Sequence, residues 1–284
     1  MAIDLLHIKL LVKTKNINMK NFDRLIIFFS KHWFNPFFTL WFNFRFLPFG
    51  QAVHLPILVW GRPKIINMSR NFEISFDCDT IKRGLVKINR TGEYPSHTGG
   101  HTEFILSGKK IVFKGKAVIG CGTRILSYLN STIIIGNHVV ISQQNTIISC
   151  EKLVFGDYAH IGSRVQIMDS SMHFVYHADE RKVQKLSAPV VIGHNSWLAN
   201  GVSIYKGTIL PPYSTVAGGS MVNQDYSQES EGTCFVESPA KPKIRNFYRI
   251  RKFSEEMKLY NYFSEHDTDT YYYDKEPSSE IYND

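Results

Sequence analysis

Residues 192–222 read IGHNSWLANGVSIYKGTILPPYSTVAGGSMV, and an aliphatic residue returns at every sixth position of this stretch. The positions are Ile192, Leu198, Ile204, Leu210, Val216 and Val222. A period of six fits neither the α-helical period of about 3.6 residues nor the period of about two of a plain strand. It fits a solenoid in which each six residues form one short strand and a corner, with the aliphatic side chain in the axis.

The same step of six recurs upstream, and small residues often follow the aliphatic one. The earlier runs are Phe113–Ile119–Ile125, Ile135–Ile141–Ile147 and Phe155–Ile161–Ile167. Three short faces close one triangular coil, and neighbouring coils pair as parallel strands. A β-sandwich would instead need alternating patterns and turns about every 8–12 residues, which this region lacks. We therefore predict an all-β solenoid, a parallel β-helix.

Composition divides the chain into three regions. Residues 1–60 are basic and rich in Phe and Trp, and we expect a helical, aromatic N-terminal region there. The β-helix is predicted over 61–223. Residues 224–284 are polar, with a helix expected around 243–263 and an acidic, tyrosine-rich tail.

The overall composition is that of a globular protein that prefers anionic partners. The net charge is +8, the pI is near 9.2 and 43% of the residues are hydrophobic, which is ordinary for a packed chain. Nucleic-acid binding is not expected, because no helix-turn-helix, OB or RRM signature is present. The four cysteines lack CxxC spacing, and no signal peptide or membrane span is evident, so we expect a cytoplasmic protein.

The repeat breaks most visibly between Ile167 and Ile192, where the chain needs an excursion over Met168–Val191. Long loops that leave a rigid solenoid often carry function. This excursion begins with Asp169-Ser-Ser-Met-His173. A neutral imidazole with a pKa near ~6.5 suits proton removal from a hydroxyl at neutral pH.

Three segments of the sequence resemble one known family. They are APVVIGHNSWLANGVSIYKGTILPPYSTVAGGSMVN (188–223), FGDYAHIGSRVQIMDSSMH (155–173) and NFRFLPFGQAVHLPI (43–57). They are similar to the hexapeptide-repeat acyltransferases, in particular to sugar and polysaccharide O-acetyltransferases, with maltose and galactoside acetyltransferases as relatives. The resemblance covers roughly residues 39–245. It implies a left-handed parallel β-helix with a C-terminal helix, acetyl-CoA as donor, no metal, and a homotrimer with sites between adjacent solenoids.

The resemblance also implies roles for residues of the excursion and the coil before it. His173 is the candidate general base. Asp169 would hydrogen-bond the imidazole or the acceptor, or cap a corner. His177 would contact the acceptor. Asn145, in Ser142-Gln-Gln-Asn145, is the candidate oxyanion donor, with a structural corner role as the alternative.

Donor binding maps by resemblance onto the last coils and the segment after them. Trp197, Asn200, Gly201, Ala217 and Gly218 would line the pantetheine arm, and ordinary corner packing is the alternative for each. In SPAKPKIR (238–245) the basic residues would meet the CoA phosphates. They are Lys241, Lys243 and Arg245. Lysine binds phosphate as a point charge, without the bidentate fork of arginine.

The resemblance implies acetyl transfer to a sugar hydroxyl of a surface polysaccharide or its lipid-linked precursor. Two alternative functions stay open. A zinc enzyme of the γ-carbonic anhydrase type would need three converging imidazoles, and the pairs His97/His101 and His173/His177 are spaced i, i+4. A non-enzymatic β-helix scaffold is the second.

The role of residues 17–60 is a separate question. Their cations and aromatic residues would either contact the inner face of a membrane or cap the open end of the solenoid. We favour the cap for Phe42–Ile57 and the membrane for Phe22–Phe38.

Overall fold

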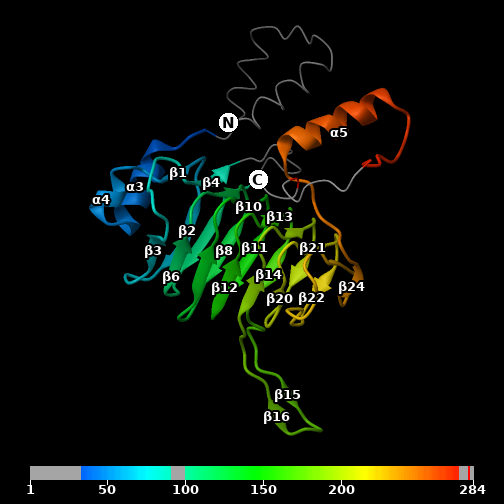
Figure 1. The fold of residues 1–284 in the computed structure, drawn as a ribbon. Coiled ribbons are helices and arrows are strands. Elements are labelled where there is room, and N and C mark those ends of the chain that lie inside the picture. The colour runs from blue at the N-terminus through cyan, green and yellow to red at the C-terminus, as the bar shows by residue number, and fades with distance from the viewer. Residues whose placement is uncertain (1–32, 91–99, 275–280, 282–284) are drawn as a thin grey trace, which may run out of the picture.

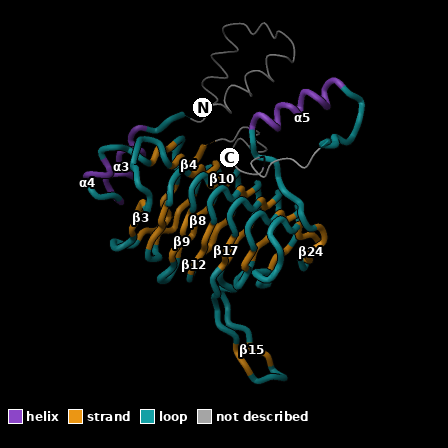
Figure 2. Tube along the Cα trace, viewed as in Figure 1, coloured by secondary structure: helices purple, strands orange, loops and turns teal. Residues whose placement is uncertain are grey.

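Short parallel strands on three faces make up the computed structural model, which describes residues 33–90, 100–274 and 281. Each turn of the chain gives one strand to each face and then stacks on the turn before it, so the molecule is a triangular prism (Figure 1; Figure 2). The predicted fold class is confirmed: a left-handed parallel β-helix with a helical, aromatic N-terminal region and a C-terminal helix.

Three sheets, one per face, run the length of the prism. Within the described residues, face 1 has 9 strands in the order β1 (Ile57–Val59), β4 (Val86–Arg90), β7 (Ala117–Gly120), β10 (Val139–Ile141), β13 (His160–Ile161), β18 (Trp197–Leu198), β21 (Thr215–Val216), β23 (Cys234–Val236) and β24 (Lys241–Ile244). In the same part of the chain, face 2 has 7 strands: β2 (Lys64–Met68), β5 (Glu103–Leu106), β8 (Arg124–Ser127), β11 (Thr146–Ser149), β14 (Gln166–Met168), β19 (Ser203–Ile204) and β22 (Met221–Val222). Face 3 has 6 among these residues: β3 (Glu73–Phe76), β6 (Lys110–Phe113), β9 (Thr132–Ile135), β12 (Lys152–Phe155), β17 (Val190–Ile192) and β20 (Ile209–Leu210).

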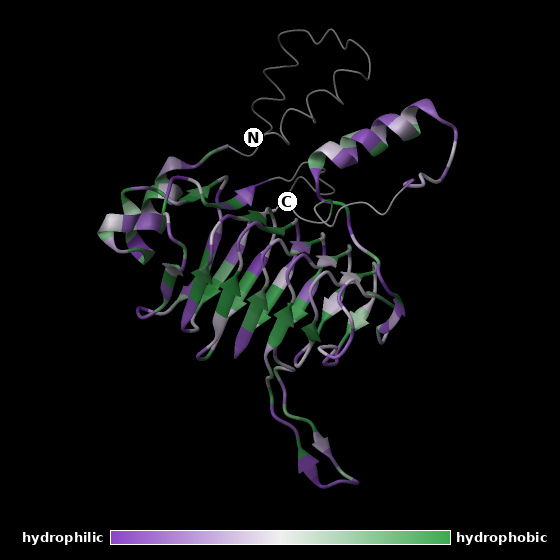
Figure 3. Cartoon of the chain, in the orientation of Figure 1, coloured by the Kyte–Doolittle hydropathy of each residue, from purple (hydrophilic) through white to green (hydrophobic). Residues whose placement is uncertain are grey.

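The aliphatic residues that recur at every sixth position form the core, as the sequence predicts. On face 2, Ile147 pairs with Ile125 on one side and Ile167 on the other, and Ile167 pairs with Ile204. Like residues therefore stack from coil to coil inside the prism, where all of them are buried. The strands of the coils carry many hydrophobic residues along the prism (Figure 3). Burying each such side chain contributes about 1.5–3 kcal/mol relative to leaving it in water.

Close contact between coils explains the small residue after the aliphatic one. At Gly156 a Cβ atom would lie 2.6 Å from the backbone nitrogen of His194 in the next coil, and at Gly193 it would lie 2.5 Å from Pro211. These neighbours are backbone atoms, which a side-chain rotation cannot move. Glycine is therefore required there for the spacing of the coils and not for a special backbone angle.

The N-terminal end of the prism is closed by α3 (Pro36–Phe46) and α4 (Phe49–Ala52). The side chain of Asn35 caps α3 by accepting a hydrogen bond from the Phe38 nitrogen at 3.0 Å. Asn43 donates to the Ile57 carbonyl at 2.7 Å and accepts from its nitrogen at 3.1 Å, and Thr39 Oγ1 accepts from the Val59 nitrogen at 3.0 Å. These bonds satisfy the free edge of β1, as exposed edges require.

The C-terminal end differs from the expected helix at 243–263. Residues Lys241–Ile244 form β24 instead, because they pair antiparallel with β23 and cover the last edge of face 1. The helix, α5 (Phe253–Glu265), begins about ten residues later and buries none of its side chains. No helix in the described part of the chain is both long and apolar enough to cross a membrane. Residues 1–32, which include most of the predicted membrane segment, lie outside the described residues.

We predict that Gly156→Ala destabilises the fold, because its methyl group has no room beside the His194 backbone. Overpacking of this kind costs about 1–3 kcal/mol, and the unfolding midpoint should fall by roughly 2–4 °C per kcal/mol. Differential scanning calorimetry measures this. Gly50→Ala is the matched control, since nothing lies within 4 Å of its added Cβ. Equal midpoints for the two variants would contradict the packing account.

Candidate active site

The predicted excursion leaves the solenoid at its second corner, between faces 2 and 3. After β14 the chain turns outward through an antiparallel bridge between Ser170 and Ser187 and forms a hairpin of β15 (Tyr176–His177) and β16 (Lys182–Val183). The hairpin projects beyond the body of the prism (Figure 1). The interrupted coil keeps its register, because Leu153 of β12 still pairs with Val190 of β17.

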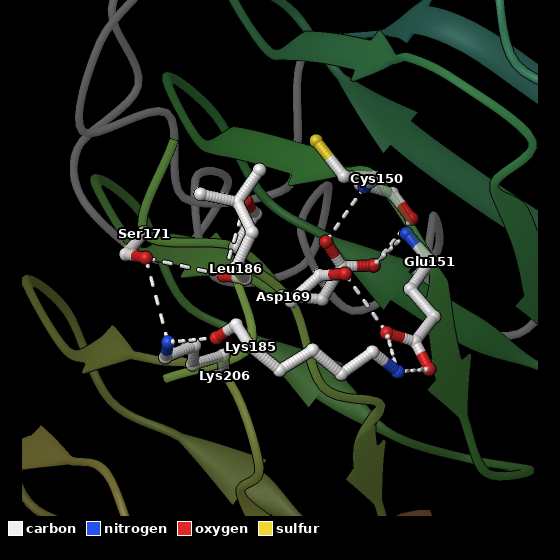
Figure 4. Close-up of polar contacts among 10 residues, drawn as sticks. Cys150, Glu151, Asp169, Ser171, Lys185, Leu186 and Lys206 are labelled. Atoms are coloured by element: carbon white, nitrogen blue, oxygen red, sulfur yellow. Dashed lines mark hydrogen bonds and ion pairs between the residues drawn. The ribbon is translucent and has the colours of Figure 1, made fainter. Parts of the chain in front are cut away.

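Asp169 anchors the point at which the excursion leaves. Its carboxylate is fully buried and accepts hydrogen bonds from Ser149 Oγ at 2.7 Å, the Cys150 nitrogen at 2.6 Å and the Glu151 nitrogen at 3.0 Å (Figure 4). These three bonds fix the turn of the preceding coil. Asp169 therefore occupies the corner-capping role, and no hydrogen bond joins it to His173 in this conformation.

A second set of polar contacts holds the base of the hairpin. Glu151 accepts from Lys185 Nζ at 2.9 Å and from Ser187 Oγ at 2.8 Å. The hydrogen bond from Lys185 is the main cause that lowers the pKa of the Glu151 carboxyl from its ordinary value. Lys206 Nζ donates to the Lys185 carbonyl at 2.7 Å (Figure 4). The base is thus tied to the coils on both sides of it.

His173 and His177 both lie on this hairpin and are exposed. The His173 carbonyl accepts a hydrogen bond from Ser171 Oγ at 3.1 Å, which fixes the bend before β15. Within residues 33–90, 100–274 and 281, the His173 ring has no hydrogen-bond partner, so both ring nitrogens are accessible. His177 lies farther along, where its Nδ1 accepts from the Glu180 nitrogen at 3.4 Å and its Nε2 lies 3.6 Å from Glu180 Oε1.

Asn145 lies at the first corner, between faces 1 and 2, with its amide directed into the coil. Its Oδ1 accepts from the Val165 nitrogen at 2.7 Å and its Nδ2 donates to the Ser142 carbonyl at 2.9 Å. The side chain is buried. This placement is the structural corner role named as the alternative, and an oxyanion contact would require the amide to leave these bonds.

The small residues assigned to the donor come together on the first corner in neighbouring coils. Asn200 Oδ1 accepts from the Ser163 nitrogen at 2.8 Å, and its carbonyl accepts from the Gly219 nitrogen at 3.2 Å. A Cβ atom at Gly218 would lie 3.1 Å from the Asn200 carbonyl oxygen. Gly201 has φ +73, in the left-handed region that favours glycine. Together with Ala217 these residues leave the corner without bulky side chains.

The three basic residues after the solenoid are already paired with carboxylates. Glu237 accepts both Lys241 Nζ at 3.3 Å and Lys243 Nζ at 3.2 Å, and these two lysines hold the pKa of Glu237 below its ordinary value, with Lys243 the larger cause. Arg245 Nη1 lies 2.7 Å from Glu229 Oε2. All are exposed pairs, which are weak in water, so a phosphate group can compete with the carboxylates for these cations.

Trp197 lies on the outer surface of face 1, beside His160 of the coil before it. The Arg249 guanidinium lies over the Trp197 ring, 5.4 Å from its centroid, and Arg249 Nη1 is 2.8 Å from His160 Nδ1. Burial, and then the charges of Arg249 and Arg251, lower the pKa of His160 from 6.5 to about 3. His160 is therefore neutral, and its Nδ1 can accept a hydrogen bond from the Arg249 guanidinium.

The two groups of candidate residues are separated by face 2. His173 leaves from the second corner, whereas Asn200, Gly201, Ala217 and Gly218 lie on the first corner and Trp197 on face 1. One face with its corner is about six residues, or ~20 Å of extended chain at ~3.3 Å per residue. The hairpin also points away from the prism (Figure 1). Face 2 thus lies between His173 and the residues expected to bind the donor in the same chain.

Metal ligands do not gather in this region. In the described ranges, no group of three or more His, Cys, Asp and Glu side chains converges as metal ligands would. His97, one member of the predicted i, i+4 pairs, lies outside them. The four cysteines form no disulfide, and burial is the main cause that raises the pKa of each thiol.

The chain also matches a protein of Escherichia coli with the provisional name lipopolysaccharide biosynthesis O-acetyl transferase WbbJ. The two are 26% identical over 165 residues, which cover 55% of this chain and 79% of the relative. The match agrees with the resemblance that the repeat and its coils indicate. The chain resembles the hexapeptide-repeat acyltransferases. No protein-family model matches it.

Solved structures with related folds include the polySia specific acetyltransferase NeuO, with a TM-score of 0.43, 16% identity and coverage of 77% of this chain and 91% of that one. A hexapeptide-repeat acetyltransferase of Vibrio cholerae, solved with acetyl coenzyme A, has a TM-score of 0.34, 26% identity and coverage of 40% and 60%.

The sequence analysis did not identify the residues that contact Trp197 or the residues that anchor the base of the hairpin. The register of six places His160 one coil before Trp197 on the same face, so this neighbour was open to prediction. Arg249 gives no such signal, because it follows the repeat. Glu151 and Lys185 likewise lie 34 positions apart in the sequence, and nothing in their local pattern joins them.

We predict that acidification lowers the free energy of unfolding of this protein through His160. With a folded-state pKa of about 3 against the ordinary 6.5, the unfolded chain binds a proton in that window that the folded chain does not, so stability falls as pH falls. The unfolding midpoint of the wild type should drop between about pH 7.5 and about pH 5 more than that of His160→Gln, which keeps an acceptor for Arg249. Equal drops would show that His160 does not carry the effect.

Proposed function

We propose that this chain transfers the acetyl group of acetyl-CoA to a hydroxyl of a sugar in a surface polysaccharide or in its lipid-linked precursor. The observation that carries the proposal is His173, exposed and without a ring partner in the described chain, on a hairpin anchored to a hexapeptide-repeat coil. The name of the Escherichia coli relative, an O-acetyl transferase of lipopolysaccharide biosynthesis, supports a polysaccharide acceptor.

In the proposed reaction the neutral His173 ring accepts the proton of the sugar hydroxyl while its oxygen attacks the thioester carbonyl carbon. The resulting tetrahedral oxyanion collapses, the carbon–sulfur bond breaks, and the CoA thiolate takes the proton back from the imidazolium. The products are the acetyl ester and free CoA thiol. Asp169 contributes by fixing the base of the hairpin through its three hydrogen bonds.

We assign donor binding to the first corner and the end of face 1. The bare surface of Asn200, Gly201, Ala217 and Gly218 suits an extended pantetheine arm, and Trp197 borders it. Lys241, Lys243 and Arg245 would exchange their carboxylate partners for the CoA phosphates. His177, on the same hairpin as His173, is the proposed acceptor contact.

Two alternatives have less support. A γ-carbonic-anhydrase-like zinc site needs three imidazoles at one point, and in the described ranges no group of three or more possible metal ligands converges. A non-enzymatic β-helix scaffold would not explain why the exposed imidazole of His173 lies on an anchored hairpin.

We further propose that the enzyme is a homotrimer in which one site is shared by two copies. His173 and the donor corner of one chain are separated by face 2, so a neighbouring solenoid must supply one of them. The outer surface of face 3 supports such packing, because the half-buried side chains of Ile134, Val154, Val191 and Ile209 form an apolar row on successive strands.

We also propose a peripheral membrane contact by the N-terminal region, on the side where lipid-linked glycans are made. Residues 17–32 of the predicted segment lie outside the described residues.

We predict that His173→Ala lowers kcat/KM for acetyl transfer by about 10²–10⁴-fold, the usual loss for a general base. Release of CoA thiol with a panel of glycan acceptors measures the rate. The unfolding midpoint and the affinity for CoA should not change, because the ring is exposed and makes no hydrogen bond or ring contact with the described part of the chain. His101→Ala, another exposed histidine, is the matched control. A His173→Ala enzyme with wild-type kcat/KM would remove His173 from the mechanism.

We predict that inactive variants complement one another if the site is shared. His173→Ala and Trp197→Ala should each be inactive alone, yet mixed oligomers from co-expression should recover part of the activity, because one interface then pairs an intact His173 with an intact Trp197. Light scattering should give the mass of a trimer. Absence of complementation in mixed trimers would place both residues in one chain's own site.

A further inference from the structure

Helix α3 has two apolar stripes on opposite sides, and only one of them is needed for the cap. Thr39, Phe42, Asn43 and Phe46 are spaced i, i+3, i+4, i+7 and are buried against the first coil. Phe37, Leu40, Trp41 and Phe44 have the same spacing and are exposed. A helix on a protein surface normally turns a polar face to water, so the second stripe calls for another partner.

The exposed stripe continues onto neighbouring elements. The ring of Phe44 lies 6.0 Å from that of Phe49 at the start of α4. Phe37, Phe38 and Trp41 line an open groove of about 450 Å³ together with Ile65 of β2. Phe37 is 83% exposed and Phe49 76% exposed. Exposed apolar surfaces of this kind mark interaction sites.

The segment that carries this stripe is cationic, and the carboxylate nearest its cations is that of Glu103 on β5, which lies 3.6 Å from Lys64 Nζ. From residue 33 to residue 72 the sequence has no Asp or Glu, and its cations are Arg45, Arg62, Lys64 and Arg70. Arg62 lies beside the start of α3, because the adjacent Gly61 donates to the Trp33 carbonyl at 2.7 Å and accepts from Asn35 at 2.7 Å. Arg62 and Arg70 are exposed and form no ion pair within the described ranges.

The geometry points to the outer side of α3 and α4, with these cations, as a docking surface for an anionic lipid bilayer. Phenylalanine and tryptophan rings seat at the headgroup boundary, and each cation near an anionic surface adds about 1 kcal/mol. The buried stripe of α3 and the exposed one thus divide capping and membrane contact between two faces of one helix. Only the purpose of this membrane contact rests on the proposed function: it would bring the enzyme to a lipid-linked acceptor.

Co-sedimentation of the full chain with vesicles tests the inference. The wild type should bind vesicles of phosphatidylglycerol and phosphatidylcholine at low salt, bind less at high salt, and bind phosphatidylcholine alone weakly. The double variant Phe37→Ser/Phe49→Ser should lower the partition coefficient by about ten-fold or more. Arg62→Gln/Arg70→Gln should remove most of the preference for the anionic lipid.

The matched control is Tyr272→Ser, an aromatic residue that is 83% exposed at the other end of the chain, and it should bind vesicles as the wild type does. A wild type that ignores anionic vesicles, or a Phe37→Ser/Phe49→Ser chain that binds them equally well, would overturn the inference. Thiol release with a water-soluble acceptor separates the two proposals, because the Phe variants should keep wild-type rates there. An inactive wild type that still binds vesicles would refute the function and not the surface.

Discussion

Parallel hydrogen bonding between successive coils is the constraint on which the rest of this molecule depends. Each strand is only a few residues long and is stable because its neighbours in the coils before and after it hold its backbone groups. That stacking fixes which residue lies above which, so Ile125, Ile147, Ile167 and Ile204 form one column. It also brings backbones so close that Gly156 and Gly193 leave no room for a Cβ atom.

The same constraint decides where functional residues can be placed. An inserted segment inside a strand would break the register on both sides, whereas one at a corner leaves the strands paired. The hairpin with His173 leaves at the second corner, and Leu153 still pairs with Val190 across the gap. Because the residues proposed for donor binding lie at the first corner, the solenoid keeps them apart from His173 of the same chain. A shared site between copies is the simplest way for this architecture to unite them.

Each end of the solenoid must be covered, since a stack of coils has a first and a last strand edge with unpaired backbone groups. At the N-terminal end, Asn43 and Thr39 bond the free edge of β1, and the aromatic residues beside them cover the core. At the other end, β24 turns back antiparallel on β23. The chain then crosses face 1, where Arg249 reaches both His160 and Trp197. The segment that follows the last coil thus brings the charge of Arg249 onto face 1 beside His160 and Trp197.

The sequence by itself determined the coil, because a six-residue period of aliphatics can be satisfied only by a chain that turns inward once per six residues. It also determined where the excursion lies and that His173 begins it, since a break in a strict period is visible without coordinates. Only the tertiary structure decided what Asp169 and Asn145 contact, because their partners at Cys150 and Val165 lie about one coil away and depend on corner geometry. It also decided that Lys241–Ile244 form a strand: local propensity allows a helix there, but the open edge of β23 offers hydrogen bonds that only a strand can accept.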